Sequence, residues 1–335
     1  IASSVLTTAD INGGTVDGIT SLSMPSGTVD IQATHPTGTS NVGFGSGTFA
    51  NIEAGGTLNT AMGVNALQDL TTGDSNTAIG YQAALNSTTA VGTTAIGRLA
   101  IGVGVLTGNY NTALGYAAGQ DLTSGEYNTV MGYQAGFNAT TANHTIAIGR
   151  AAIGTGVLTG TDNTAIGRLA GFDLTSGTYN NFMGYTSGGN ATTTNFSIAI
   201  GYFAMGTGVV TGTDNTAIGR LAGNDLTSGI NNFFGGNNAG ANATTGNYNI
   251  ALGYFSIGAG VLTGTDNIVI GRQAGNDLTT GNNNVAVGYR AGYELTTGVD
   301  NTLLGVQAGD VLTTGSNNTV IGHDAAAAAV DVSTE

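Results

Sequence analysis

The sequence predicts an all-β protein, a parallel β-solenoid of about 17 coils, from three observations. First, the phrase Asn-Thr-Ala-Ile-Gly, or a close variant, recurs between residues 41 and 322. Second, the final glycines of the phrase follow one another at steps of 17 or 18 residues, with one step of 16. Third, the chain has 58 glycines in 335 residues and no Gly-X-Y triplet period, which excludes both long regular helices and collagen. A short fixed period is typical of a solenoid, in which each repeat lies on the previous one.

The final glycines mark the expected coils. An earlier copy of the phrase ends at Gly45, and the later copies end at Gly63, Gly80, Gly97, Gly115, Gly132, Gly149, Gly167, Gly184, Gly201, Gly219, Gly235, Gly253, Gly271, Gly288, Gly305 and Gly322. Equivalent positions of successive coils should therefore lie about 4.8 Å apart in one parallel ladder.

The period also divides the chain into parts. Residues 1–40 lack it and contain a Gly/Asp/Thr-rich stretch, Thr8–Gly18, so we expect an N-terminal connector or cap. Residues 41–322 form the predicted β-roll repeat domain. Residues 323–335 contain Ala325–Ala329 and an acidic tail, and we expect them to be a C-terminal linker. The chain begins with Ile1, not methionine, and ends in the alanine run and the acidic tail, so both ends are expected to be cuts in a longer polypeptide.

Each coil is expected to contain two strands and two glycine turns. In one coil the first strand is Thr164–Ile166, before Gly167, and the second part runs through Ala170 to the turn Leu174–Gly177. Because successive side chains of a strand point to opposite faces, the large residue before each glycine is expected inside the coil. These residues are Ile79, Ile96, Leu114, Met131, Ile148, Ile166, Met183 and Ile200.

The opposite face of each strand carries the residue two positions before the glycine. It is usually alanine, but larger apolar residues occur at Val130, Phe182, Phe233, Val269 and Leu303. Long exposed apolar stripes are rare on soluble monomers, so this face needs cover. The simplest cover is a second or third copy of the chain.

The residue after each glycine predicts a column of aromatic and basic side chains. It is tyrosine at Tyr81, Tyr116, Tyr133, Tyr185, Tyr202, Tyr254 and Tyr289, and arginine at Arg98, Arg150, Arg168, Arg220 and Arg272. Only Arg290, among six basic residues, is offset. We expect arginines to stack on tyrosines. The aspartates Asp121, Asp173, Asp225 and Asp277 are available as ion-pair partners of the arginines, within a chain or across chains. A column that grips a glycan is the alternative to this structural role.

A second period of 52 residues is superimposed on the first. The glycines at 115, 167, 219 and 271 are 52 residues apart, and the stretch Thr161–Gly171 recurs unchanged as Thr213–Gly223. Three coils therefore make one larger unit, which indicates duplication of a three-coil block.

Composition excludes several classes of function. The net charge of −14 and the lack of lysine argue against nucleic-acid binding. There is no cysteine, and no apolar run is long enough for a membrane span. His35, His144 and His323 stand in unrelated contexts and form no hydrolytic triad. The turn Gly154–Gly156 lacks the strand, loop and helix of a dinucleotide site.

No catalytic, cofactor-binding or metal-binding residues are predicted, and no cofactor is expected. The Asp-Asn pairs at 162–163, 214–215 and 266–267 are calcium candidates, but the Gly-Gly-x-Gly-x-Asp loop of calcium β-rolls is missing. An asparagine before a strand more often takes the left-handed conformation or bonds its own backbone. An ice-binding face would need a regular Thr-x-Thr spacing, which the strands do not keep.

The phrase Asn76–Ala83, Asn-Thr-Ala-Ile-Gly-Tyr-Gln-Ala, resembles the head repeats of trimeric autotransporter adhesins of the YadA type. The resemblance covers residues 41–322 and implies a left-handed parallel β-roll in which three chains wrap about one axis. The coils are longer than the typical head coil. The leader Thr8–Gly18 is similar to segments of bacteriophage tail fibres, which also carry such repeats.

This resemblance implies a structural protein of the virion, not an enzyme: a rod or adhesive segment of a bacteriophage tail fibre that contributes to host attachment. The expected partners are two further copies of the chain, other tail or baseplate proteins, and a host surface glycan or protein. Nucleic acid and membrane insertion are not expected. The alternatives are the head of a bacterial surface adhesin, an extracellular filament and, last, a glycan depolymerase, which would need paired carboxylates in a groove.

Overall fold

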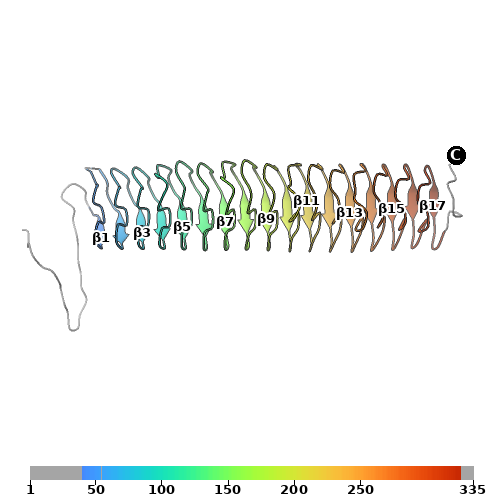
Figure 1. Ribbon diagram of the computed structural model, residues 1–335, viewed down its shortest axis with the longest axis horizontal. Helices are drawn as coiled ribbons and strands as arrows, with labels where there is room; N and C mark the ends of the chain where they lie inside the picture. Colours follow the sequence, from blue (N-terminus) through green and yellow to red (C-terminus); the bar gives the residue numbers. More distant parts are fainter. Residues whose placement is uncertain (1–39, 54, 326–335) are drawn as a thin grey trace, which may run out of the picture.

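The chain folds as one long β-solenoid (Figure 1). The computed structural model describes residues 40–53 and 55–325, and within them it contains 17 strands and no helix. The predicted connector 1–40, with Thr8–Gly18 and His35, lies outside the described residues except for Ser40. The predicted linker 323–335 lies outside them from residue 326 onward.

Every strand is three residues long. The strands are β1 (Val42–Phe44), β2 (Thr60–Met62), β3 (Thr77–Ile79), β4 (Thr94–Ile96), β5 (Thr112–Leu114), β6 (Thr129–Met131), β7 (Ile146–Ile148), β8 (Thr164–Ile166), β9 (Asn181–Met183), β10 (Ile198–Ile200), β11 (Thr216–Ile218), β12 (Phe233–Gly235), β13 (Ile250–Leu252), β14 (Ile268–Ile270), β15 (Val285–Val287), β16 (Thr302–Leu304) and β17 (Thr319–Ile321).

The 17 strands form one parallel sheet in which each strand pairs with the next along the chain. The register never slips: Thr164, Ala165 and Ile166 of β8 lie opposite Asn181, Phe182 and Met183 of β9, and the other pairs follow the same rule. Figure 1 shows the strands side by side along the long axis, with β1 and β17 at opposite ends. The predicted parallel β-solenoid is confirmed, with about 16 turns between the first strand and the last.

The expected second strand of each coil is wrong. The return part of the coil contains turns. Within residues 40–53 and 55–325, only the isolated bridges Ser87 to Leu106 and Ala139 to Leu158 have strand-like pairing there. Left-handed residues such as Gln82 (φ 55°) and Ala84 (φ 48°) interrupt the extended backbone. Coils still bond to one another in this part, as the amide of Asp173 does to the carbonyl of Gly189 at 2.9 Å.

The prediction that the large residue before each glycine lies inside the coil is wrong. The middle residue of every strand from β2 to β17 is buried, whereas the large residue before the glycine lies on the outside. Ala165 is fully buried and Ile166 is half-exposed. The physical reason is volume, because buried residues of the return part, such as Leu174 and Ile153, already fill the space opposite the strand.

Larger inward residues are accommodated by glycines across the coil. A Cβ atom added to Gly171 or Gly188 would lie 3.0 or 2.7 Å from the ring of Phe182, which is fully buried. Gly223 and Gly240 stand in the same relation to Phe234. Small and large residues therefore alternate across the interior so that its packing stays constant.

One predicted coil boundary shifts by a residue. Gly236, not Gly235, takes the backbone conformation of the series, with φ of 127° against 131° at Gly167. Gly235 lies inside β12, at the outward position that other coils fill with Ile, Leu or Met. With this correction every step of the series from Gly45 is 17 or 18 residues, and the step of 16 disappears.

The series glycines are required by close approach as well as by φ. A Cβ atom added to Gly167 would lie 2.4 Å from the carbonyl oxygen of Gly184, one coil later. No side chain fits at that distance, and φ near 130° is unfavourable for any residue with a Cβ atom.

Asparagines form a buried ladder inside the solenoid. The amide nitrogen of Asn180 donates to the side-chain oxygen of Asn163 (3.0 Å) and to the backbone carbonyl of Thr194 (2.7 Å). Its own side-chain oxygen accepts the backbone N–H of Ser197 at 3.0 Å. Each such side chain therefore joins consecutive coils and satisfies backbone groups that water does not reach. The buried members are Asn41, Asn59, Asn76, Asn111, Asn128, Asn163, Asn180, Asn215, Asn232, Asn249, Asn267, Asn284 and Asn301.

The ladder corrects the interpretation of the asparagine before each strand. The left-handed conformation belongs to the preceding residue, such as Asp162 (φ 60°), and Asn163 itself is buried. The asparagine side chain points inward at this position, where it bonds to the neighbouring coil and not to the backbone of its own turn.

The 52-residue period corresponds to one longer coil in three. In each 18-residue coil of this period two successive amides donate to one carbonyl, as Thr155 and Gly156 do to Phe172 at 3.0 and 3.3 Å. This geometry is that of a β-bulge, which absorbs one extra residue without changing the register on either side. The equivalent bulges lie at Gly104, Gly208 and Gly260.

Candidate interaction surface

The outer face of the sheet carries an apolar stripe that runs the length of the rod. The third residue of each strand points outward, and it is Ile, Leu, Met, Val or Phe in all strands except β12. Met62, Leu114, Met183 and Ile218 are 45, 41, 42 and 42% exposed. The expected uncovered apolar face therefore exists, but it is formed by the large residues before the glycines. A continuous stripe of this kind suits contact with another protein surface.

The predicted column of tyrosine and arginine is confirmed. The guanidinium of Arg98 lies between two rings, 5.7 Å from the centre of Tyr81 and 5.4 Å from that of Tyr116. The other stacked pairs are Arg150 on Tyr133, Arg168 on Tyr185, Arg220 on Tyr202 and Arg272 on Tyr289, at 5.1 to 5.9 Å. Tyrosines that are neighbours in the column also stack: Tyr116 on Tyr133 at 5.2 Å and Tyr185 on Tyr202 at 5.3 Å.

The expected ion pairs between these arginines and the aspartates of the turns are wrong within one chain, and pairs across chains stay a prediction. The ion pairs in the described part of the chain are His144 with Asp162 (3.6 Å) and His323 with Asp324 (3.1 Å), and neither involves an arginine. Asp173 instead accepts a hydrogen bond from the hydroxyl of Thr155 at 2.5 Å. The aspartates lie on the return part of the coil, so a threonine one coil earlier is nearer to them than the arginine column.

A second, exposed aromatic column was missed from the sequence. Its residues precede the ladder asparagines or the Thr145 and Ser197 that replace them: Tyr110 stacks on Tyr127 at 5.2 Å, and Tyr127 stacks on His144 at 5.3 Å. Tyr179 and Phe196 continue the column at 5.0 Å. The repeat position was visible, but Asp and Asn interrupt it often enough to hide the aromatic pattern.

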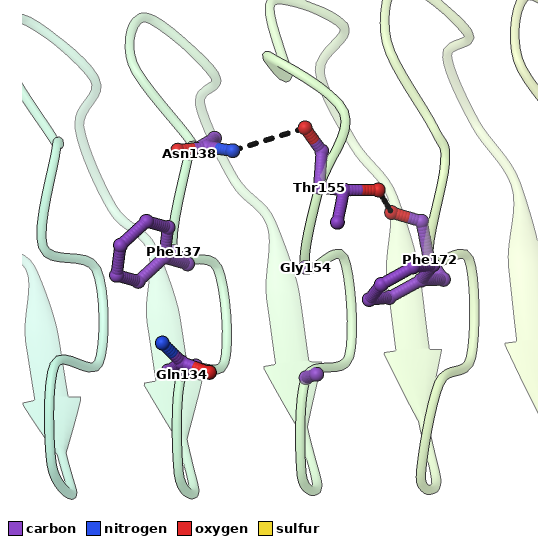
Figure 2. A pocket seen from close by; sticks show the side chains of 7 residues that line it. Gln134, Phe137, Asn138, Gly154, Thr155 and Phe172 are labelled. Carbon is purple, nitrogen blue, oxygen red and sulfur yellow. Dashed lines mark hydrogen bonds between the residues drawn. The ribbon is translucent and has the colours of Figure 1, made fainter.

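A small hollow of about 210 Å³ lies on the return face of the coils that follow β6, β7 and β8 (Figure 2). Gly154 lies between Phe137 of the previous coil and Phe172 of the next one, and the ring of Phe172 lies where a side chain at Gly154 would be. The amide of Asn138 is already used, since it donates to the carbonyl of Thr155 at 2.9 Å. The remaining lining residues are Gln134 and Ala151. The hollow is smaller than the usual 300–1,000 Å³ of a small-molecule site and has no titratable lining residue.

Titratable groups are spread along the rod. Burial raises the pKa of Asp121, and a hydrogen bond from the Gln120 side chain opposes this shift. In residues 40–53 and 55–325 no group of three or more His, Asp or Glu side chains is placed to hold a metal ion. Of the calcium candidates, Asp162 contacts His144 and Asp214 accepts a hydrogen bond from Thr213.

Comparison with known proteins leaves the fold as the main finding. No protein-family model matches the chain, and no curated protein matches it significantly. None of the described residues form a helix long and apolar enough to cross a membrane. The likeness to YadA-type head repeats therefore stays a prediction from the repeated phrase, and the surfaces that carry a functional argument are the apolar stripe and the tyrosine–arginine column.

Proposed function

We propose that the chain is a rigid segment of a bacteriophage tail fibre that contributes to host-cell attachment. The observation that carries the proposal is the unbroken register of about 16 turns. At about 4.8 Å for each turn, the rod is about 80 Å long. Each coil is hydrogen-bonded to its neighbours on both sides, so bending the rod strains many bonds at once. Such a rod holds attachment surfaces at a fixed distance from the body that carries it.

The rod is a homotrimer in this proposal, with a left-handed winding and the three apolar stripes facing a common axis. The exposed stripe supports it, because packing three stripes together removes apolar surface from water along the whole length. Three parallel copies also present each outer surface three times, which raises the avidity for a repetitive host surface without a new contact. The partners are the other tail or baseplate proteins and a glycan or protein of the host.

The first test is the mass and shape of the purified chain. Native mass spectrometry should give three times the chain mass of 33.0 kDa, and electron microscopy should show rods. A stable monomer would contradict the trimer, and compact globules would contradict the rod.

The second test is location. Antibodies against the rod, applied to virions and host cells from one culture, should label phage tails. Label on the cell surface alone would replace the proposal with a bacterial adhesin, and label on separate fibres would replace it with an extracellular filament. A screen on host polysaccharides should show no cleavage, and cleavage would favour a depolymerase.

A further inference from the structure

The tyrosine–arginine column concentrates positive charge on a strongly acidic chain. The chain has a net charge of −14, yet five of its six basic residues lie in this one column. None of the five has an ion-pair partner within the described part of the chain. The column itself, from Ser46 to His323, contains no Asp or Glu.

Acidic residues are kept away from the column by their position in the coil. They recur at two positions: six residues after the series glycine, as at Asp121, Asp173, Asp225 and Asp277, and five residues before it, as at Asp162, Asp214, Asp266 and Asp300. The arginines directly follow that glycine. Along the chain the arginines are preceded by the series glycines and, before these, by the apolar stripe. They are followed by a column from Asn65 to Gln307 in which Arg290 is the charged residue. The arginine charge is therefore compensated by nothing adjacent, and it is available to an external anion.

Stacking determines which part of each side chain is available. The ring faces of Tyr116 and Tyr133 are 9° from parallel and cover each other, and Arg98 lies over the other face of Tyr116. Neighbours along the rod thus occupy the ring faces. The guanidinium of Arg98 also donates a hydrogen bond to the hydroxyl of Tyr116 (3.3 Å), and that of Arg168 donates one to the hydroxyl of Tyr185 (3.5 Å). Each guanidinium has further N–H groups, which can bind carboxylate or sulfate in a bidentate manner. Ring faces are what nucleobases need, so the column is poorly suited to single-stranded nucleic acid.

The spacing of the arginines also disfavours nucleic acid. Arg168, Arg220 and Arg272 follow β8, β11 and β14, so they are three coils, about 14 Å, apart. A nucleic-acid strand carries a phosphate about every 3.4 Å, which leaves most of its charges facing an acidic protein. A polysaccharide with an acidic group on only some of its sugars carries fewer charges, and its many hydroxyls match the tyrosine hydroxyls.

We propose that the tyrosine–arginine column is a binding site for a linear acidic polysaccharide that lies along the rod. The proposal rests on the proposed attachment function and names the class of host ligand. The strongest part of the site is expected at Arg150 and Arg168, because they are the arginines of the column that lie in consecutive coils, after β7 and β8. These are also coils that border the hollow at Gly154.

The test uses the purified full chain and hyaluronate, in which alternate sugars carry a carboxylate. Binding is measured by calorimetry at low salt, with the neutral methyl ester of the same polymer as the ligand control. Hyaluronate should bind, the ester should not, and added salt should weaken binding because exposed charges are screened. Equal binding of polymer and ester would overturn the proposal, as would tighter binding of poly(dT) than of hyaluronate.

Matched variants locate the site. Arg168→Gln and Arg290→Gln make the same change in net charge, but Arg290 is offset from the column and stacks on Tyr293 at 4.2 Å. Arg168→Gln should weaken hyaluronate binding about tenfold, the loss expected for one charge-assisted hydrogen bond, while Arg290→Gln leaves it unchanged. Circular dichroism checks that both variants fold. Equal losses in the two variants would overturn the proposal.

The experiments can show that the polysaccharide site is wrong independently of whether the attachment function is wrong. If rods form and label phage tails but hyaluronate does not bind, the polysaccharide site is wrong and the fibre stands. If hyaluronate binds to a chain located elsewhere, the site stands and the fibre is wrong.

Discussion

The side-chain amide nitrogen of Asn128 lies 3.0 Å from the side-chain oxygen of Asn111, one coil earlier. The same nitrogen donates to the carbonyl of Ala142 at 2.7 Å, and the side-chain oxygen of Asn128 accepts the backbone N–H of Thr145 at 2.9 Å. One buried amide therefore satisfies backbone groups in its own coil and in the next one. The coils are joined through their interior as well as through the strands.

Replacing Asn128 by alanine should lower stability strongly. The change leaves the carbonyl of Ala142 and the amide of Thr145 buried without this partner, at about 1–3 kcal/mol each. Asn138→Ala is the matched control, because Asn138 makes an exposed hydrogen bond that water can replace. Urea unfolding followed by circular dichroism should show a clearly lower midpoint for Asn128→Ala only. Equal midpoints would show that the ladder does not stabilise the fold.

Two neighbouring glycines should respond in opposite ways. Gly236→Ala adds a Cβ atom 2.8 Å from the carbonyl of Gly253 at φ of 127°, which should cost about 1–3 kcal/mol. Gly235→Ile puts into β12 the residue type that other strands have there, and the nearest atom is a flexible end of Leu252. It should be neutral or stabilise the strand by about 0.5–1 kcal/mol. A lower melting temperature for Gly235→Ile than for Gly236→Ala would instead show that Gly235 belongs to the glycine series.

Ala165 and Ile166 separate folding from assembly. Ala165→Asp buries a charge in the packed interior and should prevent normal folding of the coils around β8. Ile166→Asp places the charge on the outer face, so the circular dichroism spectrum should remain that of the wild type. If the apolar stripe is the trimer contact, native mass spectrometry should then show monomers. Similar spectra for both variants would contradict the assignment of the two faces.

The carboxyl of Asp121 should make the stability of the chain depend slightly on pH. Because burial raises its pKa, the folded chain binds the proton more tightly than the unfolded chain does, so the ionised carboxyl lowers stability at neutral pH. This penalty disappears as the pH falls through the folded pKa toward the ordinary value of about 3.9. Asp121→Asn should therefore raise the melting temperature at pH 7 and not at pH 3. A gain of the same size at both pH values would assign the effect to something other than ionisation.

Gln120 provides the opposite control at the same site. Its side chain hydrogen-bonds the carboxyl of Asp121 and opposes the raised pKa. Gln120→Ala should therefore lower the melting temperature at pH 7 and have a smaller effect at pH 3.

Excision of residues 164–215 should shorten the rod and leave its fold intact. The deletion removes 52 residues with β8, β9 and β10, and it joins Asn163 to Thr216, which preserves the repeated phrase. The rod should lose about 14 Å, measurable by small-angle X-ray scattering. Deletion of residues 164–189 instead cuts a coil at its middle, so it should destroy the register and expose apolar surface. Equal folding of both products would show that coils need not be removed whole.

The sequence predicted what depends on the period alone. Equivalent residues of successive coils had to lie side by side, so the contact of Arg98 with Tyr81 and Tyr116 followed from their shared position after a glycine. The period alone does not predict which face of the strand is buried. Alternation places Ala165 and Ile166 on opposite faces, and both are apolar, so only the space left by residues elsewhere in the coil decides which is buried.

The information that was missing is nonlocal within a coil. Phe182 fits inside because Gly171 and Gly188 lie against its ring, and those contacts depend on the path of the return part. The asparagine ladder was hidden for a related reason. Every position of a repeat recurs with the same period, so recurrence alone does not distinguish a buried Asn163 from the exposed end of a turn.

The constant register has a consequence for how such a rod changes in evolution. Each coil packs on the next coil through the same kind of surface through which the previous coil packs on it. The packing of one coil therefore does not depend on the number of coils before it. Unequal recombination between the identical stretches Thr161–Gly171 and Thr213–Gly223 would add or remove 52 residues without disturbing a neighbour. The length of the rod is therefore heritable and changes in whole repeat units, while its cross-section stays the same.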